Sequence, residues 1–469
     1  MTRPARLPTG PAHLIGVAGY GMRGLARLLL GEGRAVSGTD AAPGPATDAL
    51  VREGLRWTGG EGVPRDAALV VHSAAVAPEH AELREARARG LPCLKYAAAL
   101  GAFCAERTVL ACAGTHGKST STALLALLLR HAGIDAGWLI GADPPPGLDE
   151  LPSNARAGDP MAVEACEYDC SFLQFRPRGA VITNAEKEHV DCFPTEAALL
   201  DAFGRFAAGI EPCGALAAPP AVAARLRGVT APGVRVVTFG PGGMWDVAAR
   251  RAQDEGQDVR LCGPRGEEID VRLSIPGEHN ALNAAGVVAL ACELYGCEAC
   301  ARGAAALHRF RGMRRRFEVL RRGPVTYVDD YAHHPTEVRA TVAAARERFP
   351  RAARLIAVFQ PHQATRLETF REEFAAALGA ADLTLVLPVF AAREDGAARA
   401  AAGAAFAELM VRRGAAAEFC ADFDAAGRVL DGACRRGDVV VCMGAGDITE
   451  FAAARAAAAR QAEDDGKEA

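Results

Sequence analysis

Residues 108–130, TVLACAGTHGKSTSTALLALLLR, decide the fold class of this chain. The stretch opens with an apolar, β-prone run, continues through a glycine-bearing loop and ends in an apolar helical pattern. We predict a strand over 108–113, a loop over 114–119 and a helix from residue 120 onward. A strand–loop–helix unit of this kind is typical of α/β proteins.

The loop in this unit predicts a binding site for a nucleoside triphosphate. Backbone N–H groups and the Lys118 ammonium can hold phosphates, and the Ser119 hydroxyl can reach magnesium. The general pattern G-x-x-x-x-G-K-[ST] has a glycine where this chain has Cys112. A purely structural turn is the alternative, but the position between strand and helix favours phosphate binding. The expected nucleotide contacts are Gly114, Thr115, His116, Gly117, Lys118, Ser119 and Thr120.

A second strand–turn–helix unit lies near the start, at residues 13–30, HLIGVAGYGMRGLARLLL. We predict a strand over 13–17 and a helix over 22–30, with Gly19, Gly21 and Gly24 forming a G-x-G-x-x-G turn. Such glycines let a pyrophosphate approach a helix N-terminus, and Asp40 follows the next strand-like run. A nicotinamide dehydrogenase would fit this pattern, but so would any diphosphate ligand, including a UDP-sugar.

Acidic side chains and a histidine follow the next two predicted strands. Glu164 stands at the end of one apolar run, at the expected ligand edge of a parallel sheet, and could hold magnesium. His189 lies on the loop after the following strand; it is either a ligand or a loop histidine bonded to its neighbours. Magnesium prefers oxygen ligands. Whether Glu167 or Asp169 shares the metal with Glu164 stays open.

Length and composition narrow the class of protein. A chain of 469 residues predicts about three domains. The net charge of -4 gives no basic surface for nucleic acid, and no apolar run is long enough for a signal peptide or a membrane span. The 14 cysteines are scattered, which favours reduced thiols and a cytoplasmic protein. We expect a monomer or weak homodimer.

Three cysteines have the C-x4-C-x2-C spacing that some iron–sulfur proteins use: Cys292, Cys297 and Cys300. No fourth cysteine lies nearby. Residues 285–307 read as one helix, and small buried cysteines are common in protein cores. We therefore interpret the three as core residues rather than cluster ligands.

Several motifs together resemble the Mur ligase family. GTHGKST (114–120), VEACEYDCSF (163–172), VITNAEKEHVDCF (181–193) and PGEHNALNAAGVVALA (276–291) occur in the family's order. FRGMRRRFEVL (310–320), VDDYAHHPTEV (328–338), VFQPHQATR (358–366) and VCMGAGDI (441–448) resemble its alanine-adding branch. The likeness covers almost the whole chain, and only residues 207–272 contain no recognisable motif.

The resemblance implies three α/β domains: a Rossmann-like UDP-sugar domain over 1–106, a central P-loop ATPase domain over 107–312, and a Rossmann-like amino-acid domain over 313–469. It implies a ligase that uses ATP and Mg²⁺ to join L-alanine to the carboxylate of UDP-N-acetylmuramate through an acyl phosphate, in peptidoglycan precursor synthesis. A relative that attaches a recycled tripeptide and a non-catalytic nucleotide-binding relative are the alternatives.

The resemblance also implies roles for individual residues. Further nucleotide contacts are His279, Asn280, Asn283, Arg315, Arg316 and Asp330. Substrate contacts are Gly19, Gly21, Met22, Asp40, Ser73, Tyr331, His333, His362 and Arg366. Catalytic residues are Lys118, His189, His333 and Arg366. Metal ligands are Ser119, Glu164 and His189.

Some of these roles have alternatives in the residues themselves. Asn280 could simply cap the helix that it begins, and the pair Arg315 and Arg316 could belong to a solvated charge run. We expect a strand to end at Val328 and the loop after it to carry the binding residues. A frequent form of the family has an arginine and an aromatic residue where this chain has Gln363 and Ala364. Glycine or serine therefore remains open as the amino acid.

Overall fold

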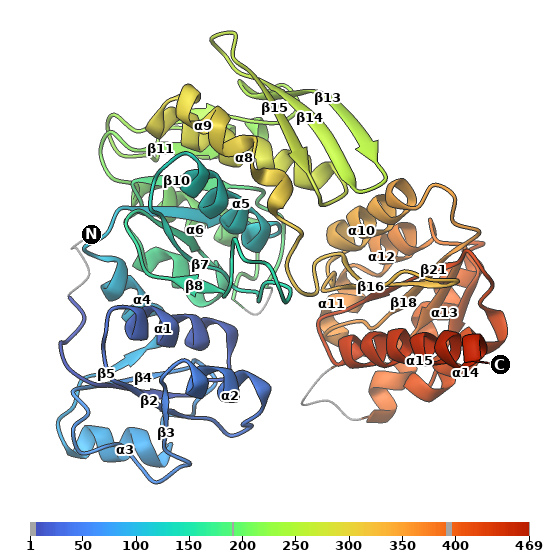
Figure 1. Cartoon of the computed structure of the whole chain (residues 1–469), viewed down its shortest axis with the longest axis horizontal. Coiled ribbons are helices and arrows are strands. Elements are labelled where there is room, and N and C mark those ends of the chain that lie inside the picture. Colours follow the sequence, from blue (N-terminus) through green and yellow to red (C-terminus); the bar gives the residue numbers. More distant parts are fainter. Residues whose placement is uncertain (1–5, 190–191, 391–395, 469) are drawn as a thin grey trace. The chain divides into compact units, whose positions relative to one another are not determined.

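The computed structural model describes residues 6–189, 192–390 and 396–468, and they form two compact units (Figure 1). The first unit comprises residues 1–250, 259–272 and 280–310, and the second comprises 251–258, 273–279 and 311–469. The described chain contains helices on mixed and parallel sheets, so the α/β prediction is confirmed. None of its helices is both long and apolar enough to cross a membrane.

The first sheet has five parallel strands in the order β3-β2-β1-β4-β5. This order reverses at β1, which creates a ligand-binding crevice at the carboxyl ends in such folds. The strands are β1 (Ala12–Ile15), β2 (Val36–Thr39), β3 (Arg56–Trp57), β4 (Leu69–His72) and β5 (Cys93–Lys95). The helices are α1 (Tyr20–Gly31), α2 (Pro45–Arg52), α3 (Ala81–Ala88) and α4 (Tyr96–Cys104).

The second sheet has seven strands in the order β12-β11-β10-β6-β9-β7-β8, and only its edge pair β7–β8 is antiparallel. The strands are β6 (Val109–Ala113), β7 (Gly137–Leu139), β8 (Ala155–Arg156), β9 (Met161–Glu164), β10 (Gly179–Ile182), β11 (Ala215–Ala218) and β12 (Arg235–Thr238). The helical segments are α5 (Lys118–His131), the 3₁₀ segment η1 (Tyr168–Gln174), α6 (Glu196–Ala208), α7 (Pro220–Arg225), α8 (Glu278–Tyr295), α9 (Cys297–Ala304) and the 3₁₀ segment η2 (Leu307–Arg309).

The stretch without a motif, residues 207–272, supplies β11 and β12 and then a separate three-stranded sheet. That sheet has the order β13-β14-β15, with β13 (Asp246–Gln253), β14 (Gly256–Cys262) and β15 (Glu268–Leu273). Buried and exposed residues alternate along β15, as in a strand with one solvated face.

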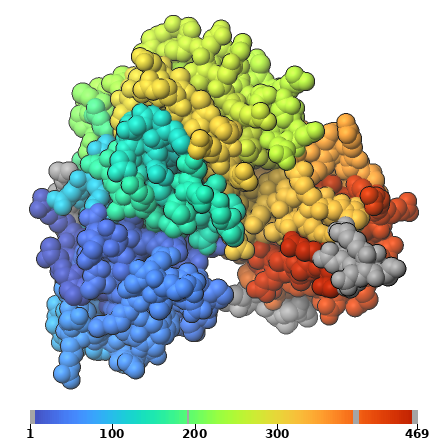
Figure 2. Space-filling view, viewed as in Figure 1, coloured from blue at the N-terminus to red at the C-terminus, as the bar shows by residue number. Residues whose placement is uncertain are grey.

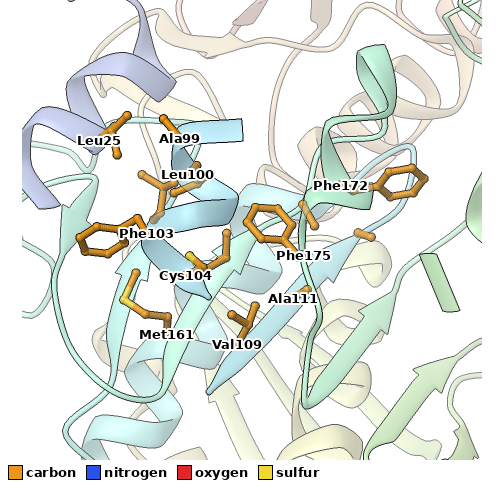
Figure 3. Packing of buried hydrophobic residues seen from close by; sticks show 14 of the residues in the cluster. Leu25, Ala99, Leu100, Phe103, Cys104, Val109, Ala111, Met161, Phe172 and Phe175 are labelled. Carbon is orange, nitrogen blue, oxygen red and sulfur yellow. The ribbon is translucent and has the colours of Figure 1, made fainter. Parts of the chain in front are cut away.

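One hydrophobic core joins the first two sheets (Figure 3). Leu25 of α1 and Phe103 of α4 belong to the same buried cluster as Val109 and Met161 of the second sheet and Phe172 of η1. Phe172 stacks on Phe206 with ring centroids 4.9 Å apart. Aromatic pairs stabilise a core beyond the effect of the apolar area that they bury. The cluster, which includes residues of α4, therefore holds α4 against the central sheet.

The second unit contains a six-stranded sheet in the order β16-β17-β21-β18-β19-β20, with only β16–β17 antiparallel. The strands are β16 (Glu318–Arg321), β17 (Thr326–Asp330), β18 (Leu355–Phe359), β19 (Leu383–Val386), β20 (Ala417–Phe419) and β21 (Val439–Met443). The helices are α10 (Pro335–Arg348), α11 (Ala364–Thr369), α12 (Arg371–Leu378), α13 (Gly396–Arg412), α14 (Phe423–Ala433) and α15 (Ile448–Glu468).

Two local predictions are wrong. The helix expected over residues 285–307 is broken at Gly296, whose φ of +85° lies in the left-handed region that glycine tolerates. The strand expected to end at Val328 continues through Asp330, because its register with β21 pairs Asp329 with Cys442 and Asp330 with Met443. The two aspartates therefore belong to the sheet and not to the loop.

The contact between α5 and α9 depends on a glycine, and it allows a test of the packing. A Cβ on Gly303 would lie 2.2 Å from the Leu128 carbonyl oxygen, so we expect Gly303→Ala to lower the free energy of unfolding by about 1–3 kcal/mol. A Cβ on Gly432, which is exposed in α14, meets nothing within 4 Å. Gly432→Ala should therefore raise stability by up to about 1 kcal/mol. Thermal unfolding followed by circular dichroism measures both, and equal shifts would contradict this packing.

Candidate active site

The loop between β6 and α5 is shaped by two glycines with positive φ. Gly114 has a φ of +129°, and a Cβ there would lie 2.1 Å from the Thr183 hydroxyl oxygen. Gly117 has a φ of +81°, and its Cβ would lie 2.6 Å from the Asn283 Oδ1. The loop therefore passes so close to the segment after β10 and to α8 that a side chain at either position would be excluded.

Hydrogen bonds from the segment after β10 hold the same loop. The His116 backbone N–H donates to the Asn184 Oδ1 at 2.8 Å. The Thr115 hydroxyl donates to the Glu186 carbonyl oxygen and accepts from the Glu186 N–H, both at 3.0 Å. These bonds fix the loop at the carboxyl end of the central sheet, where its remaining backbone N–H groups can face an anion.

Lys118, the first residue of α5, lies in a buried ion pair. Its Nζ donates to the Gly114 carbonyl oxygen at 2.7 Å and to the Glu167 carboxylate at 2.9 Å. Although burial lowers the pKa of Lys118, the charge of Glu167 raises it above its ordinary value. The ammonium is therefore fully charged at neutral pH, as phosphate binding requires.

Glu167 is one of the two acidic residues whose role as a metal ligand the sequence left open. In the structure its carboxylate has two partners, Lys118 and His189. It is fully buried; its Oε1 lies 3.2 Å from the His189 Nε2, and its carboxylate accepts from Lys118. Burial alone would raise the pKa of Glu167, but Lys118 and His189 together lower it. Asp169 instead faces Lys95, 3.8 Å away.

Two of the three predicted metal ligands supply oxygen atoms near this pair. Ser119 is buried in the first turn of α5, and Glu164 ends β9, which pairs with β6 so that Glu164 lies opposite Cys112. The Glu164 Oε2 accepts from the Gly141 N–H at 2.7 Å, which orients its carboxylate. A hydroxyl and a carboxylate fit Mg²⁺. His189, the third, contacts Glu167 instead.

Asn280 and Asn283 lie one turn apart at the start of α8, as predicted. The Asn283 Nδ2 donates to the Asn280 Oδ1 at 3.3 Å, and both side chains are buried. Asn283 is the residue against which Gly117 packs. This pair therefore supports the phosphate loop whether or not it also contacts a nucleotide. His279 packs on Gly277, whose added Cβ would lie 2.5 Å from its ring.

In the amino-terminal turn, the glycine with a positive φ is not one of the G-x-G-x-x-G glycines but Gly16, with a φ of +82°. A Cβ on Gly16 would lie 3.0 Å from the Cβ of Ser73, which follows β4. The Asp40 Oδ2 accepts from the Ala18 N–H at 2.7 Å, so this carboxylate holds the turn. Gly19 precedes the first residue of α1 with an ordinary φ of -64°.

Three other residues of this turn pack against neighbouring side chains. A Cβ on Gly21 would lie 2.6 Å from the Tyr96 ring, and one on Gly24 would lie 2.2 Å from the Leu139 Cδ1 of the central sheet. Met22 is buried in the shared core, at 3% exposure. Contact of Gly19, Gly21 and Met22 with a substrate stays a prediction.

In the second unit, Asp330 joins two backbone segments. Its Oδ2 accepts from the Phe317 N–H at 2.8 Å and its Oδ1 from the Ala332 N–H at 2.7 Å. Burial raises the pKa of Asp330 to about 6, although the charge of Arg316 lowers it. This carboxylate fixes the loop that follows β17.

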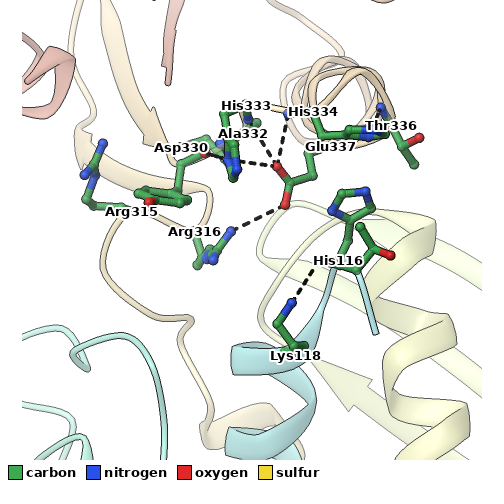
Figure 4. A network of polar contacts seen from close by, with 12 residues as sticks. His116, Lys118, Arg315, Arg316, Asp330, Ala332, His333, His334, Thr336 and Glu337 are labelled. Atoms are coloured by element: carbon green, nitrogen blue, oxygen red, sulfur yellow. Dashed lines mark hydrogen bonds and ion pairs between the residues drawn. The ribbon is translucent and has the colours of Figure 1, made fainter. Parts of the chain in front are cut away.

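Aromatic and cationic side chains surround that loop (Figure 4). The guanidinium carbons of Arg315 and Arg316 lie 4.8 and 5.0 Å from the centroid of the Tyr331 ring. Arg315 also donates to the Gly444 carbonyl oxygen at 2.8 Å, which connects the loops after β17 and β21. The two arginines have different partners: Arg315 bonds to the backbone of its own unit and lies 3.7 Å from the Asp329 carboxylate, whereas Arg316 lies 3.8 Å from the Glu337 carboxylate.

Glu337, which sequence reasoning did not select, organises the His333–His334 segment. Its carboxylate accepts from the N–H groups of His333 and His334 at 3.1 and 3.3 Å, as in a helix capping box. The same carboxylate lies 3.2 Å from the His333 Nδ1 and 3.8 Å from the Arg316 Nη1. The available signal was the spacing of a glutamate three residues after the residue that caps α10.

His362 and Arg366 follow β18, and the structure brings them together. The Arg366 Nη1 lies 2.9 Å from the His362 Nδ1, and Arg366 is buried at 6% exposure. The His362 and His333 rings are 6.0 Å apart, which connects this pair to the loop after β17. Gln363, which lies between His362 and Arg366 in the sequence, has a φ of +65°. The three histidine and arginine side chains predicted from separate motifs therefore form one group.

The chain is similar in sequence to known proteins along almost its whole length. Three domain profiles match in order: the Mur ligase family catalytic domain at residues 11–108, the Mur ligase middle domain at 112–291, and the Mur ligase glutamate ligase domain at 315–446. A UDP-N-acetylmuramate–L-alanine ligase of Kineococcus radiotolerans is 40% identical over 450 residues, 94% of each chain. The chain belongs to the Mur ligase family.

Further relatives of this Mur ligase support the same family membership. The enzyme of the same name from Saccharopolyspora erythraea is 40% identical over 453 residues, covering 93% of this chain and 91% of the relative. The crystal structure of the UDP-N-acetylmuramate–alanine ligase of Thermotoga maritima matches with a TM-score of 0.79 at 25% identity, covering 97% and 100% of the two chains. The predicted family and three-domain architecture are confirmed; the residue boundaries between domains stay predictions.

A murein peptide ligase from Psychrobacter arcticus has the same fold, with a TM-score of 0.66 at 22% identity over 96% of this Mur ligase and 98% of that chain. At this identity the likeness concerns the fold alone. It does not distinguish between the amino acids or peptides that the family members attach.

The buried Asp330 makes the stability of this Mur ligase depend on pH. Because the folded carboxyl has a pKa of about 6, above the ordinary value near 4, the folded state binds a proton more tightly. Stability should therefore fall as pH rises from about 4 to about 6. In Asp330→Asn this dependence is lost, and the variant should gain about 2–3 kcal/mol relative to the natural protein across that range. Urea unfolding at several pH values measures it, and Asp66→Asn, at an exposed side chain, is the control. Parallel curves for Asp330→Asn and the natural protein would contradict the shift.

Proposed function

We propose that this Mur ligase joins L-alanine to the carboxylate of UDP-N-acetylmuramate, with ATP and Mg²⁺, in peptidoglycan precursor synthesis. The observation that carries the proposal is the 40% identity, along nearly the whole chain, to relatives that bear the name of this activity. The buried, charged Lys118 at the phosphate loop supports it chemically. The proposal includes a cytoplasmic location and the three domain ranges 1–106, 107–312 and 313–469.

The reaction needs charge neutralisation, because a carboxylate is a poor electrophile until one of its oxygens becomes a phosphate leaving group. Two anions must then approach each other. The loop from Gly114 to Thr120 would bind the triphosphate through backbone N–H groups, and Lys118 would hold its outer phosphates. Mg²⁺, held by Ser119 and Glu164 and approached by His189, would supply further positive charge.

The amino acid would be bound by the group around the loop after β17. Arg366 would pair with its carboxylate, and the contact with the His362 Nδ1 sets the direction of the guanidinium. Tyr331 and His333 would face its amino group and the muramoyl group. The His333 Nδ1 lies 2.9 Å from the Tyr331 carbonyl oxygen and 3.2 Å from Glu337, which fixes the ring.

The UDP moiety would bind at the carboxyl ends of β1 and β4. Gly19 precedes α1 and Gly21 is in its first turn; the N-terminus of this helix favours a diphosphate, and Ser73 lies on the neighbouring loop after β4. Asp40 would act on the substrate indirectly, since its carboxylate already accepts from the Ala18 and Ala42 N–H groups.

Phosphate release tests the proposed function. Purified protein with Mg-ATP and UDP-N-acetylmuramate is given alanine, glycine, serine or the tripeptide in separate reactions. Release with alanine supports the proposal, and release with glycine or serine alone changes its amino acid. Release with the tripeptide alone selects the peptide-attaching relative, and nucleotide binding without any release selects a non-catalytic protein.

Removal of the Lys118 charge should abolish most activity. We expect Lys118→Met to lower kcat by about 10²–10³-fold, the usual loss when one charge stabiliser of a transition state is removed. The variant leaves Glu167 buried without its main partner, so the double variant Lys118→Met, Glu167→Gln separates loss of charge from loss of folding. Lys95→Ala, at an exposed lysine side chain, is the control. Full activity in Lys118→Met with intact folding would contradict the assignment.

Glu337 is expected to act as a positioning residue. Glu337→Gln keeps an acceptor for the His333 and His334 N–H groups but removes the charge that faces Arg316 and the His333 ring. We expect its melting temperature to change little, whereas kcat/KM for the amino acid falls about tenfold because the His333 ring is held less firmly. Glu337→Ala also loses the cap, at about 0.5–2 kcal/mol of stability. An unchanged kcat/KM in Glu337→Gln would leave Glu337 with a structural role alone.

A further inference from the structure

Arg23 places a buried positive charge near the N-terminus of α1. It is the fourth residue of this helix and is 8% exposed. Its Nη2 lies 3.0 Å from the Asp143 Oδ2, and its guanidinium carbon lies 4.4 Å from the centroid of the Tyr20 ring. A cation in the first turn of a helix opposes the helix dipole, and the first turn of α1 has no acidic residue. Asp143, from the segment after β7, therefore supplies the negative charge that stabilises Arg23 in this position.

The segment that carries Asp143 also holds Glu164, the predicted metal ligand at the end of β9. The Gly141 N–H donates to the Glu164 Oε2 at 2.7 Å. A Cβ on Gly141 would lie 2.7 Å from the Glu164 Oε1, so the backbone lies against the carboxylate. Three prolines follow Asp143, at residues 144–146, and their fixed φ angles limit the movement of the segment. A displacement of Asp143 is therefore expected to move Gly141 and, with it, the carboxylate.

A buried amide ties the other end of the same segment to α1. The Asn154 Nδ2 donates to the carbonyl oxygens of Tyr20 and Ile140, each at 3.1 Å, and the Ile140 N–H donates to the Asn154 carbonyl oxygen at 2.8 Å. Asn154 is fully buried. Residues 140–143 are thus connected to the first turn of α1 at both ends, through Asn154 and through Arg23. In Figure 2 the blue surface of the amino-terminal residues borders the teal surface of the α5–β7 region, in agreement with the contact between α1 and β7.

We propose that Arg23 and Asp143 are positioning residues for the metal site. Their ion pair holds residues 140–143, so that Gly141 fixes the Glu164 carboxylate. The inference rests on the proposed function, in which Glu164 helps to hold Mg²⁺. Because Mg²⁺ demands a nearly ideal octahedral arrangement of its ligands, a small displacement of one carboxylate lowers the affinity for the ion. Loss of a group that orients a metal ligand typically lowers the affinity by about 10–100-fold.

The Mg²⁺ dependence of ADP binding tests the inference without relying on ligase activity. Calorimetry gives the ADP affinity of the full-length protein in EDTA and at graded MgCl₂ concentrations. In Asp143→Asn we expect the half-saturating Mg²⁺ concentration to rise about tenfold, while the ADP affinity in EDTA stays unchanged, because only the metal ligand is displaced. Glu164→Gln should raise this concentration at least as much, since the ligand itself is weakened.

Asp135→Asn is the matched control. The Asp135 Oδ1 also pairs with an arginine, at 2.7 Å from the Arg156 Nη2, but Asp135 lies before β7 and its side chain is 77% exposed. The Mg²⁺ dependence of this variant should equal that of the natural protein. An unchanged Mg²⁺ dependence in folded Asp143→Asn or Glu164→Gln, or an equal change in Asp135→Asn, would overturn the inference.

A double variant separates positioning from folding. Asp143→Asn lowers stability, because it leaves the Arg23 charge buried without its partner. Arg23→Met, Asp143→Leu removes both charges, which often leaves stability nearly unchanged. Thermal unfolding should show this variant to be folded, with the half-saturating Mg²⁺ concentration still raised. A return of that concentration to the natural value would mean that the pair serves folding alone and would overturn the inference. Failure of the natural protein to bind ADP, with or without Mg²⁺, would instead overturn the proposed function, and the inference with it.

Discussion

The buried ion pair between Lys118 and Glu167 is the interaction on which the candidate active site depends. A charged ammonium and a charged carboxylate, both removed from water, are stable only when each is satisfied by further hydrogen bonds. Lys118 donates to the phosphate loop as well, and Glu167 also contacts His189. The pair therefore joins three segments of the central sheet: the loop after β6, the segment after β9 and the segment after β10.

The rest of the first unit holds these segments in register. Parallel pairing of β6 with β9 and β10 brings their carboxyl ends to one edge, and Asn184 and Asn283 support the loop from two sides. The shared core with α4 and η1 stabilises the same edge, because Phe172 of η1 lies only a few residues after Glu167. Catalytic chemistry and hydrophobic packing thus use adjacent residues.

In the second unit, too, the predicted site residues follow the carboxyl ends of neighbouring strands. Its neighbouring strands β17, β21 and β18 are followed by Tyr331, Gly444 and the His362–Arg366 pair, respectively. Asp330 and Glu337 accept backbone N–H groups and so set the loop before any substrate binds. Carboxylates here position the cationic side chains, whereas in the first unit a carboxylate compensates a cation directly.

The sequence by itself determined the family and the α/β class, because strand ends and glycine turns are local patterns whose meaning does not depend on distant contacts. It also predicted site residues, among them Lys118, Glu164, Tyr331 and Arg366, and these assignments stay predictions. Only the tertiary structure decided that Glu167 pairs with Lys118, that Gly21 and Gly24 serve packing, and that Glu337 organises the histidines. It also decided that the helix breaks at Gly296 and that β17 extends to Asp330, because pairing with β21 and contact between helices outweigh local propensity.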